Sequence, residues 1–100
     1  MKIIRNNKDV KSLKTDEKLI ECRRGLVTYY RFLCFHPREP DYVILLNIHE
    51  EPKKFHISEL IGRFYTNYSN RDIVTYRRDF ALKQIESFEE YLSELEKNEH

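Results

Sequence analysis

The chain of 100 residues has little of what phosphate-binding loops and flexible linkers require. Its two glycines, Gly25 and Gly62, cannot form a glycine-rich loop that cradles a phosphate. No Gly-x-Ser-x-Gly motif is present to place a serine nucleophile on a strand-to-helix turn. With three prolines, no low-complexity tract and no internal repeat, a linker or a solenoid is excluded. We therefore expect one small domain over residues 1–100, with no cofactor.

Long hydrophobic runs and a cysteine framework are absent as well. The longest unbroken apolar run covers residues 43–46, whereas a membrane helix needs about 20 apolar residues. Residues 1–7 carry charge but lack the apolar segment of a secretory signal. Cys22 and Cys34 are too few for a disulfide scaffold, and a free cysteine among apolar neighbours behaves as a small hydrophobic residue. We expect a cytoplasmic protein with no membrane partner.

The net charge is only +1, but the charge is distributed unevenly. Residues 1–24 carry +4, residues 25–79 carry +1 and residues 80–100 carry −4. A basic amino end and an acidic carboxyl end indicate a polarised surface. A dedicated nucleic-acid binder is usually more basic overall, so this balance favours other partners.

Two apolar and aromatic runs, residues 26–35 and 42–48, predict the central strands of the sheet. Strand side chains alternate between faces, and a sheet wetted on one side alternates apolar with polar residues. Here both faces are apolar, so either both are covered or one is free for a partner. A tight turn is expected at Arg24-Gly25, and residues 53–57 can add a short strand. Residues 2–17 could form a hairpin that turns at Asn6-Asn7 or a loose basic arm.

The clearest helix lies near the carboxyl end. Its apolar residues recur at spacings of four, three, four and three, which places them in one stripe: Ala81, Ile85, Phe88, Leu92 and Leu95. Asp79 is the expected N-cap. We expect this helix to lie across the sheet, with a helix pair at a dimer interface as the alternative.

A shorter helical pattern follows Ser58 and ends at turn-forming residues 67–70. Residues 72–76 are β-branched and fit either a short strand or an early helix start. Together these patterns predict an α+β fold: an antiparallel β-meander of three to five strands, packed against one long C-terminal amphipathic helix plus one short helix.

The patterns that resemble metal sites fail on geometry or spacing. Asp41 with Glu51-x-Lys53 resembles the carboxylates of a magnesium-dependent nuclease. They flank one extended strand, however, and about ten residues at ~3.3 Å each separate them by roughly 30 Å. Cys34 and His36 form one loose pair without the second short-spaced pair that zinc sites use. We therefore expect no metal site and no catalytic residue, and predict that the chain is not an enzyme.

Arginines interleaved with aromatic residues are the stronger signal, because arginine stacks on aromatic rings and binds phosphate or carboxylate. Tyrosine, phenylalanine and arginine are also enriched at protein interfaces. The unremarkable interpretation is that the aromatic residues form the core and arginine stems cover them. We expect the strand face that carries Arg31 to be the wetter one, with a partner-binding surface of Tyr29, Arg31, Leu33 and Phe35.

The other face of that strand, with Leu26, Tyr30, Phe32 and Cys34, is then expected to pack on Ile85, Phe88 and Leu92. The sequence thus predicts a small non-catalytic protein that acts by protein–protein contact, as an adaptor or inhibitor, with another protein or a second copy of itself as partner. Small accessory proteins of phages and mobile elements are an analogy from size alone. The alternative is a nucleic-acid-binding protein that uses Arg23, Arg24, Arg63, Arg77 and Arg78.

Overall fold

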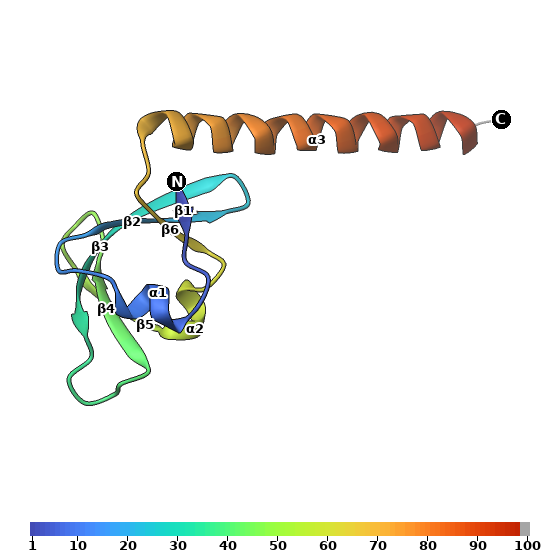
Figure 1. Ribbon diagram of the computed structural model, residues 1–100. Helices are drawn as coiled ribbons and strands as arrows, with labels where there is room; N and C mark the ends of the chain where they lie inside the picture. The colour runs from blue at the N-terminus through green and yellow to red at the C-terminus, as the bar shows by residue number, and fades with distance from the viewer. Residues whose placement is uncertain (99–100) are drawn as a thin grey trace.

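A computed structural model describes residues 1–98 as one antiparallel sheet with two short helices and one long helix (Figure 1). In chain order the elements are β1 (Lys2–Ile3), α1 (Asn7–Lys11), β2 (Lys18–Arg23), β3 (Leu26–Phe35), β4 (Tyr42–Leu46), β5 (Pro52–His56), α2 (Ile57–Leu60), β6 (Phe64–Thr66) and α3 (Asn70–Asn98). The strand order is β1-β6-β2-β3-β4-β5. The expected α+β class is confirmed, although the sheet has six strands rather than three to five.

The β2–β3 hairpin turns at Arg24-Gly25, as predicted. Arg23 pairs with Leu26, so the loop has two residues. Both loop residues have positive φ, +51° at Arg24 and +80° at Gly25. Positive φ at both central positions is the geometry of a type I′ turn, whose twist matches that of the flanking strands. The hairpin tip is therefore a tight, well-defined corner of the sheet.

A β-bulge at Leu33 changes which face of β3 each later residue occupies. Phe32 pairs with Leu45, whereas Cys34 pairs with Ile44 and Phe35 with Val43. One extra residue in a strand reverses the alternation beyond it. Phe35 therefore lies on the same face as Phe32, whose ring centroid is 5.1 Å away. The expectation that Phe35 shares a face with Arg31 is wrong, because strict alternation does not allow for a bulge.

The inner face of the curved sheet packs on α1 and α2. Its core consists of Ile4, Val10, Leu13, Leu19, Phe32, Val43, Leu45, Ile57, Leu60 and Phe64. Tyr30 and Phe55 pack at the margin of this core. The prediction that Ile85, Phe88 and Leu92 of the long helix cover this face is wrong, because all three are more than half exposed. The short helices α1 and α2 cover this face instead, and the sequence pattern predicted no helix where α1 lies.

The outer face of the sheet is covered in part by the first three turns of α3. Ile20 on β2 is fully buried, and it pairs with Tyr29 on one side and Tyr65 on the other. On the helix, Ile73 is 4% exposed. The backbone N–H of Gly25 donates to the Tyr76 hydroxyl at 3.1 Å, which fixes the helix to the hairpin tip. Beyond these turns α3 projects past the sheet (Figure 1), and the molecule is 64 Å long and about 27 Å wide.

The long helix begins nine residues earlier than the predicted cap at Asp79. Ser69 and Asp72 form a reciprocal cap: the Asp72 N–H donates to Ser69 Oγ at 3.2 Å, and the Ser69 N–H donates to Asp72 Oδ2 at 2.9 Å. Such a pair satisfies two backbone donors of the first turn. Residues 72–76, three of which are β-branched, are thus helical, which settles the alternative left open by their pattern.

Two other segments differ from their predicted form. Residues 2–17 contain β1 and α1 rather than a hairpin or a loose arm, and Asn6 caps α1 through a bond from the Asp9 N–H to its side chain at 3.0 Å. The helical pattern after Ser58 stops at Leu60, because the chain becomes extended at Ile61 and then forms β6. Phe64 and Tyr65 fit a strand as well as a helix, and the pairing of β6 with β2 decides between them.

The sheet ends at β5, a strand with one neighbour. It begins with Pro52, which cannot donate a backbone hydrogen bond, and it carries Lys53 and Lys54. The Lys54 ammonium forms an ion pair with Glu39 at 2.7 Å and lies 4.3 Å from the centre of the Tyr42 ring. Proline and lysine are residues that protect the edge of a sheet from pairing with another strand.

The contact between the hairpin tip and α3 predicts different costs for substitution of the two glycines. A Cβ at Gly25 would lie 2.5 Å from the Phe80 ring, whereas a Cβ at Gly62 would meet nothing within 4 Å. Both positions have φ near +80°, so both alanine variants carry the same backbone strain. We expect Gly25→Ala to destabilise the fold by at least about 1 kcal/mol more than Gly62→Ala in urea unfolding.

The Gly25→Ala, Phe80→Ala double variant should recover most of that difference, because it removes the ring that the new Cβ meets. Equal losses for the two glycine variants would show that α3 moves away from the hairpin tip at no cost.

The cap of α3 predicts a dependence of stability on pH. The Ser69 backbone N–H, followed by the Met1 amino group 3.2 Å away, lowers the pKa of Asp72. A carboxyl group whose pKa is lowered in the folded state stabilises the fold at pH values above its unfolded pKa. This stabilisation is lost as the pH falls through the folded pKa. Asp72→Asn should therefore unfold at lower urea at pH 7, and its difference from wild type should shrink below about pH 4. A difference that is constant down to acid pH would contradict this role.

Candidate interaction surfaces

The projecting part of α3 carries an apolar stripe that nothing in the structure covers. We call Ala81, Ile85, Phe88, Leu92 and Leu95 the α3 stripe. Their spacing of four, three, four and three is that of a and d positions in a heptad. The four larger residues are 41–66% exposed, and Leu82 and Tyr91 beside them are also more than half exposed. Contiguous exposed apolar surface of this kind marks an interaction site.

The face of α3 that packs on its own domain is not the face that carries the stripe. Ile73, Tyr76 and Phe80 contact the sheet or the hairpin tip, while Val74 in the same turns is 64% exposed. With 3.6 residues per turn, the docked residues lie on the order of 100° around the helix from the stripe. The stripe and the docked face thus point in different directions, and beyond the docked turns every residue from 81 to 98 is exposed.

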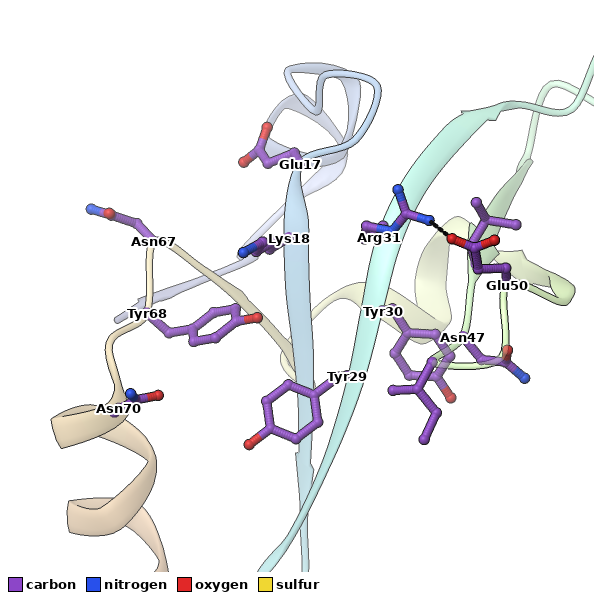
Figure 2. A pocket seen from close by; sticks show the side chains of 12 residues that line it. Glu17, Lys18, Tyr29, Tyr30, Arg31, Asn47, Glu50, Asn67, Tyr68 and Asn70 are labelled. Carbon is purple, nitrogen blue, oxygen red and sulfur yellow. Dashed lines mark hydrogen bonds and ion pairs between the residues drawn. The ribbon is translucent and has the colours of Figure 1, made fainter.

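A second surface is an open groove on the outer face of the sheet, of about 1050 Å³ (Figure 2). Tyr29 of β3 and Tyr68 of the β6–α3 connection lie at its centre, with ring centroids 6.4 Å apart and planes inclined by 59°. Asn67 and Asn70 line the side nearer α3, and Asn47 lines the opposite side. The groove offers aromatic rings and amides, a combination suited to an extended peptide or to stacked planar groups.

Arg31 at the groove is already neutralised by carboxylates. Its guanidinium donates to Asp16 at 3.2 Å and to Glu50 at 3.1 Å (Figure 2 shows the bond to Glu50). The Arg31 side chain is 37% exposed, and both carboxylates are mostly exposed, so the pairs add little stability. The two carboxylates do occupy the guanidinium nitrogens that would otherwise bind a phosphate. This groove is therefore less suited to binding an anion than its composition suggests.

The structure divides the four residues predicted to bind a partner. Tyr29 and Arg31 line the groove together on the outer face. Leu33 lies at the bulge, where its carbonyl accepts a bond from the Thr15 hydroxyl at 3.2 Å. Phe35 lies on the inner face near the end of β3 and is 37% exposed. The four side chains therefore do not form one continuous surface.

The five arginines of the nucleic-acid alternative are exposed, and four are near the hairpin tip. Arg23 ends β2 and Arg24 lies in the turn, and the Arg63 carbonyl accepts a bond from the Cys22 N–H at 3.2 Å. Burial raises the pKa of Cys22, and Arg77 lies close enough to oppose that shift in part. Arg78 instead pairs with Asp79 at 3.2 Å. The sequence could not show this proximity, because it depends on the pairing of β2 with β6 and on the docking of α3.

His36 and His56 use their ring nitrogens to bind backbone N–H groups of their own segments. Nδ1 of His36 accepts bonds from the backbone N–H groups of Arg38 and Glu39, and His56 caps α2 through its own Nδ1. Over residues 1–98, no three histidine, cysteine or acidic side chains are placed to hold a metal ion. Within the same residues, no helix combines the length and the apolar character needed to cross a membrane.

Sequence reasoning missed the groove residues Asn67, Tyr68 and Asn70. Their composition marked only the end of a helix and the start of a turn. Their place beside Tyr29 follows from the pairing of β6 with β2, which joins segments about 45 residues apart in the chain. No local pattern carries that information.

The surroundings of Cys22 predict slow alkylation. Burial raises the pKa of its thiol, and the nearby Arg77 cation partly opposes this shift. In a Cys34→Ser background, Arg77→Ala should raise the pKa of Cys22 further and slow its reaction with iodoacetamide at pH 8, since the thiolate is the reactive form. Arg78→Ala, which removes an exposed arginine paired with Asp79, is the matched control and should leave the rate unchanged. Equal rates in all three proteins would show that Arg77 does not act on the thiol.

In comparisons with known proteins, no protein-family model, curated protein or solved structure matches this chain. Its function is therefore argued from the α3 stripe, the groove and the arginines at the hairpin tip.

Proposed function

We propose that this chain is a small non-catalytic binding protein that acts by protein–protein contact, and that its contact surface is the α3 stripe. The observation that carries this proposal is the exposure of an apolar stripe on the part of α3 that projects past the sheet (Figure 1). An amphipathic helix buries its apolar side against another element in most folded proteins. Here the domain supplies no such element, so a partner does.

The character of the exposed residues supports protein rather than nucleic acid as the partner. Phe88, Tyr91 and the leucines supply apolar and aromatic contact area, which is typical of the buried centre of protein interfaces. The same part of α3, residues 81–98, carries five glutamates against two lysines. A negatively charged helix repels the negatively charged phosphate backbone. Affinity for nucleic acid depends on several cationic contacts, which this part of α3 does not supply.

The heptad spacing indicates what kind of element the partner presents. Residues at a and d positions insert between side chains of a facing helix, and a helix laid along the stripe would bury all five members together. A flat sheet would contact the stripe over less of its length. An α-helix is thus the favoured partner element.

The arginines at the hairpin tip support a second candidate function less well. Arg23, Arg24, Arg63 and Arg77 come from segments near the hairpin tip, and several cations close together are what a phosphate contact would need. The aromatic groove is on the same outer face, but its Arg31 is neutralised. We therefore rank nucleic-acid binding second.

Site-specific photo-crosslinking in the cells that naturally make the chain tests the proposed function. Tyr91 is replaced by the photoreactive residue p-benzoylphenylalanine, which keeps an aromatic ring beside the stripe. Glu90, next in sequence but on the opposite side of the helix, takes the same replacement as the matched control. We expect protein adducts from position 91 and few from position 90, and the adduct mass identifies the partner.

Equal yields from the two positions, or no adduct from either, would contradict a protein contact at the stripe. An excess at position 91 that disappears in the Ile85→Glu, Leu92→Glu background would assign the contact to the stripe itself.

A further inference from the structure

We infer that the partner on the α3 stripe is a second copy of this chain, with the two helices parallel and in register. This inference rests on the proposed function, since it names the occupant of the same surface. The exposure of the stripe, its heptad positions and the charges that border them support this occupant.

Residues 1–98, the part of the chain that the structure describes, leave the stripe uncovered. The first three turns of α3 are held by Ile73, by the bond to the Tyr76 hydroxyl and by Phe80 against Gly25. The stripe begins at Ala81, directly after the last of these contacts, and it faces away from the docked side. From there on the helix projects past the sheet, and every residue from 81 to 98 is exposed whatever side of the helix it occupies (Figure 1). The occupant is therefore another molecule.

The stripe suits a copy of itself. With Ile85 and Leu92 at a positions, the d positions are Ala81, Phe88 and Leu95. Every seam position from 81 to 95 is apolar, so two copies aligned in register would bury apolar residues against apolar residues in each layer. The next a position toward the amino end is Arg78, which pairs with Asp79 and ends the seam where the domain begins.

The residues that border the seam distinguish a parallel from an antiparallel pair. The e positions are Leu82, Glu89 and Glu96, and the g positions include Gln84 and Tyr91. In a parallel pair, each g residue meets the e residue of the next heptad in the partner. Gln84 then faces Glu89, and Tyr91 faces Glu96. An amide and a phenol can each donate a hydrogen bond to a carboxylate, so no like charges meet.

An antiparallel pair brings e positions against e positions. Glu89 of one copy would then lie beside Glu89 of the other, and Leu82 would face Glu96. Like charges on neighbouring helices repel, and a leucine beside a carboxylate satisfies neither group. The remaining charges, at Lys83, Glu86, Glu90, Glu94 and Lys97, lie on the outside of the pair in either arrangement.

The shortness of the seam is offset by preorganisation. Coiled coils are usually recognised over three to four heptads or more, and this seam has little more than two. An isolated helix of this length would be marginal in water. Here the Ser69–Asp72 cap and the docked turns already form the helix, so association orders fewer residues. We expect a reversible dimer whose fraction rises with protein concentration.

Sedimentation velocity on the purified full chain over a wide concentration range tests self-association. Wild type should shift from monomer to dimer as concentration rises, and the dimer should persist in high salt because the seam is apolar. Ile85→Glu with Leu92→Glu should remain monomeric, whereas Glu86→Gln with Glu90→Gln, on the outside, should dimerise as wild type does. Each variant should keep the far-ultraviolet circular dichroism and urea midpoint of its domain, since these positions lie beyond the docked turns.

Disulfide trapping tests the orientation. In a Cys22→Ser, Cys34→Ser background, Leu95→Cys should form a disulfide-linked dimer, because position 95 meets position 95 only in the parallel pair. In a centred antiparallel pair these positions would be about 15 Å apart along the helices, too far for a disulfide. Ser93→Cys, on the outside, is the control and should not be linked.

A charge variant gives an independent test of orientation. Gln84→Glu places a carboxylate opposite Glu89 only in the parallel pair and should weaken dimerisation severalfold at low salt. Ser87→Glu makes the same charge change away from the seam and should have a smaller effect. Equal effects of the two variants would contradict the parallel register.

The outcomes separate this inference from the proposed function. A wild-type chain that is monomeric at every concentration overturns the inference, while a photo-adduct with a different protein at position 91 still supports helix-mediated binding. A dimer that survives Ile85→Glu with Leu92→Glu places the interface elsewhere and overturns the inference. Linkage of Ile85→Cys to Leu95→Cys in mixed samples would establish an antiparallel pair and overturn the orientation.

Discussion

The contact between the β2–β3 hairpin tip and α3 determines what the rest of the molecule presents. At this corner a glycine with positive φ lets the Phe80 ring approach the backbone, and the Gly25 N–H donates to Tyr76. Ile73, at the start of the same helix, and Ile20 on the outer face of β2 are both buried. These few contacts fix the rotation of a 29-residue helix about its axis. Because a helix is stiff, that rotation sets the direction of side chains several turns farther on. That rotation sets the direction in which the stripe points, while its exposure follows from the projection of residues 81–98 past the sheet (Figure 1).

The sheet has two apolar faces, and they are covered in different ways. The inner face closes over α1 and α2, which are too short to be stable alone and depend on the sheet. The outer face is covered only in part, where α3 starts, and the uncovered remainder forms the groove around Tyr29 and Tyr68. The abundance of aromatic residues in β3 therefore reflects two separate packing layers as well as one exposed surface.

Elements defined by local chemistry could be predicted from the sequence. The Arg24-Gly25 turn, the course of β3 and β4 and the apolar stripe of the last helix all follow from turn propensity and periodicity. The bulge at Leu33 could not be predicted, because it depends on how β4 pairs with β3. The start of α3 was misplaced, since Ser69 and Asp72 cap it as well as Asp79 could. Periodicity revealed that the stripe is apolar, but only tertiary contacts decide whether its own sheet covers it. For the same reason Tyr29 and Arg31 proved to be neighbours at the groove, while Phe35 lies on the other side.

The edge strand β5 limits the forms that any assembly of this protein can take. With Pro52 at its start and Lys53 and Lys54 along it, the strand resists the addition of another strand. At the other end of the sheet, β1 has only two residues. Growth by continuous strand pairing would be open-ended, because each added copy exposes a new edge. A helix pair, in contrast, buries the contact surface of both copies and leaves none for a further copy. Association through α3 would therefore stop at a fixed number of subunits, so the exposed apolar stripe would not lead to fibres.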